Sequence, residues 1–336
     1  MCKSGRVRLL GDPDGTPELL ALRALKLGDL LVAVPAIRAI KRAHPDHRVI
    51  LAVPGWLDPV LDLVEGVDAL LPTPGLNAPL SIQPGRVDTV VNLHGKGPES
   101  RDLLDLLHPR RKVGHRAPGW DGPEWLDGLL ERFRWTRLVT AHGMPADPDD
   151  VALKDPGASD RPGAAVVHVG AFYGCRQWPV ERFAAVARAL ERKGLEVVFT
   201  GSEAERARAL ETAEQAGLAD DRVLAGRIGL RAFAALVRAA AIVISADTGA
   251  AHLASAYRVP SVIIFGPAPV EEWGPPPGPH IVLTDARLRV GDTFGAEPDP
   301  ALLAVQIEDV LGAASTLLDG LPLVDGSPLL GGPPRP

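Results

Sequence analysis

The polar residues with the clearest chemical potential lie in the stretch Ala241–Pro267. Its apolar runs predict a strand, a turn, a helix and a second strand, and Asp247, Thr248, Gly249 and His252 fall where the first strand meets the helix. In open parallel sheets, ligands bind beyond the carboxyl ends of the strands. Free backbone N–H groups and the positive end of the helix dipole make such a turn a suitable phosphate-binding site. The sequence therefore predicts a ligand site here.

The residue types at this turn suggest different roles. Thr248 is suited to cap the helix, and Gly249 lets the backbone approach a phosphate. Asp247 would repel a phosphate, so contact with sugar hydroxyls suits it better. The alternative is ordinary turn chemistry for all three residues. His252 is either a site residue or a buried histidine that is hydrogen-bonded to the backbone.

A second carboxylate, Asp29, has a similar setting in the first half of the chain. It follows the apolar run Leu19–Leu25 and Gly28, and apolar residues then recur at helical spacing. An aspartate at such a turn could act as a general base that removes a proton from an acceptor hydroxyl. The alternative is an aspartate that only accepts hydrogen bonds from N–H groups of the helix.

Three other side chains could contact a substrate. Arg176 precedes a predicted helix, and its guanidinium could bind a diphosphate through two parallel hydrogen bonds. The alternative is a surface arginine on a loop. His94 and Lys96 follow the predicted strand 87–93 and could bind an acceptor. Cys175 has no obvious base nearby in the sequence, which argues against a nucleophile.

Composition limits the classes of function. A chain of 336 residues suggests two domains, and a net charge of −6 argues against general nucleic-acid binding. Two cysteines form neither a disulfide framework nor a metal site by themselves. No apolar segment reaches the roughly 18 residues that a membrane span requires, and the N-terminus lacks the apolar core of a signal peptide. We expect a cytoplasmic protein with at most peripheral membrane contact.

Strand and helix patterns alternate through both halves, which predicts parallel sheets with helices on both faces. The segment 141–163 is rich in Pro, Gly, Asp and Ala and predicts an interdomain linker. We expect two Rossmann-like domains that face each other across a cleft. The expected divisions are an N-terminal extension (1–18), an acceptor-side domain (19–150), a donor-binding domain (164–300), a C-terminal crossover helix (301–318) and a flexible tail (319–336).

Four segments, in order, resemble glycosyltransferase family 9, the heptosyltransferase family. They are KLGDLLVAVP within 25–35, VVHVGAFYGCRQWPVERF at 166–183, VVFTGSE at 197–203, and SADTGAAHLASA followed by FGP within 241–267. The last is close to the family pattern D-[ST]-G-x-x-H-L-A-A and F-G-P, and it is the most specific of the four. The resemblance covers about residues 20–315.

The resemblance implies a GT-B fold, in which a C-terminal helix packs back on the first domain. It also implies an inverting, metal-independent transfer of a sugar from a nucleotide-diphospho-sugar, with ADP-heptose the favoured donor and no cofactor. Asp29 then matches the catalytic base, Arg176 stands where the family usually has a phosphate-binding lysine, and Asp247 matches the donor-sugar contact. The N–H groups of 248–251 would hold the diphosphate.

The remaining site predictions complete both halves of the site. The expected donor-binding set also includes Gly170, Gly201, Thr248, Gly249, Ala250, Ala251 and His252, the last as support for the turn. His94 and Lys96 are the expected acceptor-binding residues, and the acceptor is a glycan, a lipid-linked sugar or a natural product. Closure of the domains would exclude water and limit donor hydrolysis.

Two alternatives to a glycosyltransferase stay open from the sequence. One is another GT-B enzyme, such as a nucleotide-sugar epimerase, and the other is a non-enzymatic protein that binds a nucleotide sugar. A dinucleotide oxidoreductase is disfavoured because no G-x-G-x-x-G follows a strand at either domain start.

Overall fold

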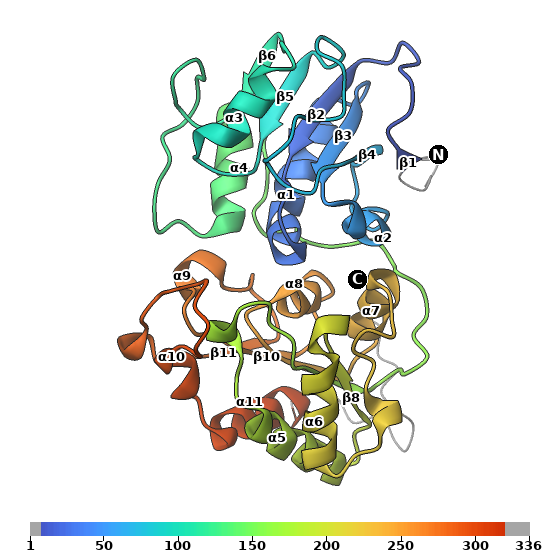
Figure 1. Cartoon of the computed structure of the whole chain (residues 1–336), viewed down its shortest axis with the longest axis vertical. Helices are drawn as coiled ribbons and strands as arrows, with labels where there is room; N and C mark the ends of the chain where they lie inside the picture. Colours follow the sequence, from blue (N-terminus) through green and yellow to red (C-terminus); the bar gives the residue numbers. More distant parts are fainter. Residues whose placement is uncertain (1–7, 320–336) are drawn as a thin grey trace. The chain divides into compact units, whose positions relative to one another are not determined.

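A computed structural model describes residues 8–319 (Figure 1). The chain forms two compact units, of which the first ends at Asp155 and the second begins at Pro156. This division falls inside the predicted linker segment 141–163. Most of the predicted tail lies outside the described residues, as do the first seven residues of the predicted extension.

The first unit contains a parallel sheet of six strands in the order β1-β4-β3-β2-β5-β6. All five residues of the central strand β2 are buried, as expected where both faces of a parallel sheet are covered. The short strand β1 lies in the predicted extension. The strands are β1 (Arg8–Leu9), β2 (Glu18–Leu22), β3 (Arg48–Val53), β4 (Ala69–Pro72), β5 (Thr89–Asn92) and β6 (Arg111–Val113).

Helices α1 and α4 of the first unit pack against each other. Alternate residues of β2 point to the same face of the sheet. Leu20 and Leu22 both join the core cluster that contains Leu104 of α3. The helices are α1 (Leu27–Ala43), a 3₁₀ turn (Gly55–Leu57), α2 (Asp58–Leu61), α3 (Pro98–Asp105) and α4 (Glu131–Ala141).

Two helix starts in this unit differ from the sequence pattern. Pro35 predicts either a kink or a later start of the helix, and α1 begins at Leu27 and continues past the proline, so the later start is wrong. The sequence also predicts a helix over 125–135, but α4 begins only at Glu131, because the preceding residues form a loop that includes Gly128 at φ 70°. Trp125 therefore lies outside α4.

The second unit contains a parallel sheet of five strands in the order β11-β10-β9-β7-β8. The apolar run 197–200 predicts a strand, and β8 has these bounds. The strands are β7 (Ala165–His168), β8 (Val197–Thr200), β9 (Ile242–Ala246), β10 (Ser261–Ile264) and β11 (His280–Leu283). Val223 forms only an isolated bridge to Phe199, where the sequence predicts a short strand.

Helices cover both faces of this sheet. Val262 and Ile264 of β10 join a core cluster with α5 and α11, whereas Ile263 packs with Ala251 of α8 on the opposite face. The α-helices are α5 (Val180–Arg192), α6 (Arg206–Ala216), α7 (Leu230–Arg238), α8 (Gly249–Ala256), α9 (Val270–Trp273), α10 (Pro300–Leu303) and α11 (Ile307–Asp319). The 3₁₀ turns are Gly174–Arg176, Glu203–Glu205, Asp220–Arg222 and Ala286–Leu288.

The single helix predicted over 301–318 is divided into α10 and α11. Two side chains from the start of α5 bind the carbonyl groups at the break. Trp178 Nε1 donates to Val305 O over 3.1 Å, and Arg182 Nη1 donates to Leu303 O and Val305 O, each over 2.7 Å. These bonds satisfy carbonyl groups that a continuous helix would pair internally. The contacts of α11 are with α5 and β9–β11, and its packing on the first domain stays a prediction.

Candidate active site

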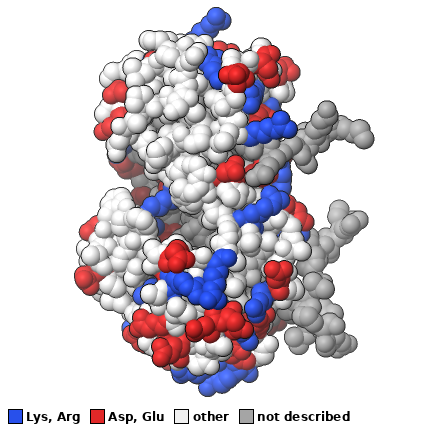
Figure 2. Space-filling view, turned by 45° about the vertical axis from the view of Figure 1, so that its right-hand side comes forward, with Lys and Arg blue, Asp and Glu red and all other residues white. Residues whose placement is uncertain are grey.

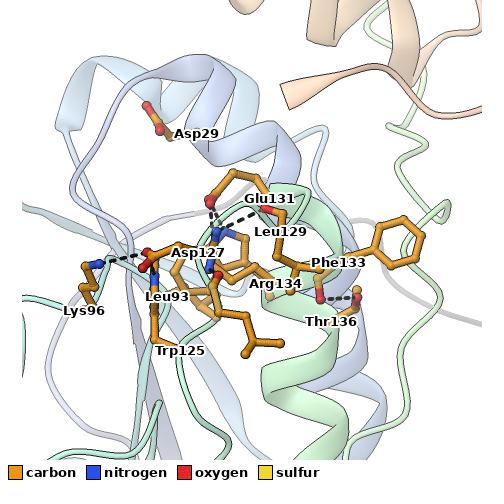
Figure 3. Close-up of polar contacts among 12 residues, drawn as sticks. Asp29, Leu93, Lys96, Trp125, Asp127, Leu129, Glu131, Phe133, Arg134 and Thr136 are labelled. Carbon is orange, nitrogen blue, oxygen red and sulfur yellow. Dashed lines mark hydrogen bonds and ion pairs between the residues drawn. The ribbon is translucent and has the colours of Figure 1, made fainter. Parts of the chain in front are cut away.

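Asp29 is the third residue of α1, close to the carboxyl end of the central strand β2. Its Oδ2 accepts a hydrogen bond from the backbone N–H of Lys26 over 3.2 Å, so the helix-start interaction expected as an alternative is present. The side chain keeps 24% of its surface exposed (Figure 3). Asp29 is therefore oriented by the helix end and still accessible to a substrate.

Arg23, which the sequence reasoning missed, lies behind this aspartate. Only 1% of its surface is exposed, and its Cζ lies 4.5 Å from the ring centroid of Trp135. Nε donates to the main-chain oxygen of Asp29 over 2.8 Å, and Nη1 donates to Leu93 O. Nη2 lies 3.8 Å from Asp29 Oδ1 and 3.6 Å from Glu131 Oε2. Burial lowers the pKa of Arg23, and the two carboxylates oppose that shift.

Glu131 begins α4 and gathers donors from its own helix. Its Oε1 accepts from Arg134 Nε over 2.6 Å, and its Oε2 accepts from Trp135 Nε1 over 2.9 Å. Arg134 also donates to Leu129 O over 3.1 Å and lies over the Trp125 ring (Figure 3). A charged residue directly after an apolar strand, and the Glu-x-x-Arg spacing at a helix start, are the sequence signals that could have indicated Arg23 and Glu131.

The two predicted acceptor-binding residues, His94 and Lys96, differ in their exposure to solvent. His94 is largely buried, and desolvation together with the charge of Arg23 lowers its pKa to about 4, against the opposing effect of Asp29. It is therefore neutral near pH 7. Lys96 is 60% exposed, and its Nζ donates to Asp127 Oδ1 over 2.9 Å (Figure 3).

In the second unit, Thr248 caps α8 as the sequence predicts. Its Oγ1 accepts a hydrogen bond from Ala250 N–H over 3.3 Å, and the helix begins at Gly249, just past the carboxyl end of β9. Ala250 and Ala251 are both buried in the first turn of α8. The expected strand-turn-helix arrangement is therefore present.

Asp247 forms the charged centre of this turn. Its side chain is 5% exposed, and Oδ2 accepts a hydrogen bond from Arg176 Nη1 over 3.3 Å. His252 Nε2 lies 3.8 Å from the other carboxylate oxygen. The structure thus brings together three residues that the sequence predicted for the donor side.

Gly170 and Gly201 follow β7 and β8, and both lie against the side chain of Glu205. A Cβ on Gly170 would lie 2.3 Å from Glu205 Oε2, and a Cβ on Gly201 would lie 3.2 Å from Glu205 Cβ. Glu205 Oε2 accepts a hydrogen bond from Ser202 N–H over 2.6 Å. The two glycines therefore have a local packing reason, and their donor-binding role stays a prediction.

The loop that carries Arg176 is bonded to a distant segment of the same unit. Cys175 N–H donates to Gly295 O over 3.0 Å, and Asp299 N–H donates to Cys175 O over 3.1 Å. A Cβ on Gly174 would lie 1.6 Å from Ala296 O, so this close approach requires glycine. Burial raises the pKa of the Cys175 thiol, which agrees with the argument against a nucleophile.

The described residues 8–319 contain neither a candidate metal cluster nor a candidate membrane span. No three His, Cys, Asp or Glu side chains in this range gather where they could hold a metal ion. No helix in the same range is long and apolar enough to cross a membrane. Figure 2 shows acidic and basic side chains mixed over the surface in that view.

Comparison with known proteins supports the predicted family. The sequence model of glycosyltransferase family 9 (heptosyltransferase) matches residues 140–286. Lipopolysaccharide heptosyltransferase 2 of Salmonella typhimurium is 24% identical over 82% of this chain and 91% of its own length. These matches confirm the resemblance to glycosyltransferase family 9 that the sequence motifs indicate. The chain is a glycosyltransferase, and the epimerase and the non-enzymatic binding protein are set aside.

Solved structures confirm the GT-B fold of this glycosyltransferase. A family 9 glycosyltransferase of Veillonella parvula superposes with a TM-score of 0.72 at 21% identity, over 90% of this chain and 97% of that one. The ADP-heptose lipopolysaccharide heptosyltransferase II of Escherichia coli gives 0.71 at 19% identity, over 90% and 98% of the two chains.

Proposed function

We propose that this glycosyltransferase moves a heptose from ADP-heptose to a hydroxyl group of a glycan or related acceptor, with inversion at the anomeric carbon. The donor follows from the relatives, since lipopolysaccharide heptosyltransferases and an ADP-heptose enzyme are among them. The observation that carries the proposal is the pair of carboxylates at two strand-to-helix turns, one accessible and one bound to an arginine.

In the proposed reaction, Asp29 takes the proton of the acceptor hydroxyl as its oxygen attacks the anomeric carbon. The new carbon–oxygen bond forms as the bond between the anomeric carbon and the phosphate oxygen breaks. The electron pair of the broken bond leaves with the nucleoside diphosphate. One displacement inverts the configuration, and the product keeps the acceptor oxygen.

The second unit supplies the groups that suit the donor. Arg176 is 27% exposed, so its guanidinium can meet a diphosphate while it stays bonded to Asp247. The N–H groups at the start of α8 suit the same phosphates, because they carry the positive end of the helix dipole. Together these groups would stabilise the charge of the leaving group without a metal ion.

Binding and stereochemistry test the proposal. Thermal-shift titrations should show stabilisation by ADP-heptose and by ADP, and less by UDP-sugars. Transfer should give a product whose anomeric configuration, followed by proton NMR, is opposite to that of the donor. Turnover should persist in EDTA. Retained configuration would exclude the single displacement, and failure to bind any nucleotide sugar would exclude the proposed donor.

A further inference from the structure

The guanidinium of Arg23 is more deeply buried than the aspartate it supports. Nε and Nη1 bind two carbonyl oxygens, those of Asp29 and Leu93. The buried Nη2 has no hydrogen-bond partner among the described residues, although two carboxylates lie within 4 Å of it. A buried cation with a spare donor is costly to maintain, so its position calls for a reason beyond packing.

The bonds to the two carbonyl groups hold the start of α1 against the end of β5. Arg23 follows β2 directly, Asp29 lies in the first turn of α1, and Leu93 follows β5. One rigid fork therefore fixes the main chain of Asp29 relative to two neighbouring strands of the sheet. A lysine could supply the charge here but could not make both bonds with the same geometry.

The spare Nη2 has an unequal relation to its two carboxylates. Glu131 already accepts hydrogen bonds from Arg134 and Trp135, at 2.6 and 2.9 Å. The Asp29 carboxylate instead accepts one backbone N–H bond and is partly exposed. The positive charge of Arg23 can therefore act on Asp29, while the negative charge of Glu131 reduces its effect.

We propose that Arg23 is a positioning residue for Asp29, which fixes the main chain of the base and stabilises its carboxylate, and that Glu131 limits this stabilisation. The inference rests on the proposed role of Asp29. It adds to that role two buried residues, Arg23 and Glu131, that determine the position and the charge stabilisation of the Asp29 carboxylate.

The balance depends on the other charges near Asp29. The charged or titratable groups that act on Asp29 or on Arg23 are Lys26 at the N-cap of α1, His94 after β5, and Glu131 and Arg134 on α4, of which the last two act on Arg23. Desolvation keeps His94 neutral near pH 7, so it adds no charge there. Arg23 and Glu131 then form the pair whose removal should have opposite effects.

Carbon-13 NMR of the aspartate carboxyl groups measures this directly in the intact protein. The Asp29 signal is assigned by its loss in Asp29→Asn. At a fixed pH within the titration of the Asp29 signal, Arg23→Gln should increase the protonated fraction of this carboxyl group, because a nearby opposite charge favours the ionised carboxylate. Glu131→Gln should decrease the same fraction, because Arg23 then acts on Asp29 alone. Changes in the same direction, or no change, would overturn the proposal.

Two matched controls separate this effect from the general loss of a buried ion pair. Glu18→Gln removes a buried carboxylate that binds Arg86 over 2.6 Å at the opposite end of β2. Arg132→Gln removes a buried arginine of α4 whose Nε lies 3.1 Å from Asp149 Oδ1. Neither control should change the protonated fraction of Asp29. A change in both controls as large as in Arg23→Gln would reduce Arg23 to a structural residue.

Arg23→Lys keeps the test informative if Arg23→Gln does not fold. The lysine should keep the protonated fraction of Asp29 near that of the wild type and still lower turnover about tenfold or more, because it cannot hold both carbonyl groups. Wild-type turnover in Arg23→Lys would exclude the positioning role. If Asp29→Asn itself keeps full turnover, the proposed base fails, whereas the NMR shifts still decide whether Arg23 and Glu131 act on Asp29.

Discussion

The two units each pair an aspartate with an arginine near the carboxyl end of a central strand, but they bury opposite partners. In the first unit, Arg23 is 1% exposed and Asp29 is 24% exposed. In the second, Asp247 is 5% exposed and Arg176 is 27% exposed. The more accessible partner has a proposed role in the reaction in both units, as a base in one unit and as a phosphate-binding cation in the other.

This comparison shows that the same two residue types can serve opposite purposes. A buried charge with an opposite neighbour acts as a fixed electrostatic support, because its own solvation has already been lost. The exposed partner keeps the freedom to exchange a proton or meet a ligand. Changing the exposed partner should therefore affect chemistry or ligand binding, and changing the buried partner should affect the exposed one.

The largest expected effect follows from Asp29→Asn. It should lower turnover by at least about a hundredfold and leave donor affinity nearly unchanged, because it removes the base alone. Asp309→Asn is the matched control, since Asp309 also accepts an N–H bond from the residue three positions before it, at 2.8 Å in α11. Equal, small effects of both variants would mean that Asp29 only supports its helix.

Arg176→Gln should come next, with turnover reduced by about a hundredfold and weaker donor binding, because both the donor and its leaving group lose a cation. Arg176→Lys should recover part of the loss, since a point charge replaces a planar fork. Calorimetric affinity for ADP and steady-state rates measure the two effects. Unchanged ADP affinity in Arg176→Gln would place the phosphates elsewhere.

A smaller effect is expected from Asp247→Asn, of about tenfold in donor affinity. The variant releases Arg176 from its hydrogen bond and removes the proposed sugar contact, and hydrogen bonds that involve a charge are commonly worth about 1.5–3 kcal/mol. Titration with ADP and with ADP-heptose separates these causes. A loss confined to ADP-heptose would support the sugar contact, and an equal loss for both would indicate the role through Arg176.

The smallest effect concerns pH-dependent stability at His94. Its pKa is about 4 in the folded protein and 6.5 in an unfolded chain, so the unfolded state binds more protons between these values. The stabilisation is present above pH 6.5 and is lost as the pH falls towards 4. Replacing His94 with Asn should reduce the loss between pH 7 and pH 5 by roughly 1 kcal/mol, after allowance for partial exposure. Urea unfolding at both pH values measures it, and an unchanged difference would contradict the assigned pKa.

Local sequence patterns were sufficient for much of the second unit. The apolar run Val197–Thr200 is buried as a strand, and Thr248 caps α8 as its residue type suggests. The predicted turn also contains the expected Asp247. Short-range chemistry determines these features, so the sequence alone could indicate them.

Features that depend on distant partners were missed. Arg23 binds groups from the end of β5 and contacts a carboxylate on α4, which is more than one hundred residues away in the sequence. Trp125 follows the apolar-aromatic pattern of a helix, but it lies in a loop, where its ring meets His115 edge-on and lies under the guanidinium of Arg134. Tertiary contacts override the local pattern in both cases, and no single-segment rule includes them.

The bonds around Cys175 have a consequence for engineering donor preference. The loop that carries Arg176 is joined to Gly295 and Asp299, and Trp178 beside it binds Val305. A chimaera that exchanges residues 170–178 alone would join a loop from another protein to the native segment 295–305, whose hydrogen-bonding groups are matched to the native loop. The exchangeable module is therefore discontinuous, and 295–305 should be transferred together with the loop.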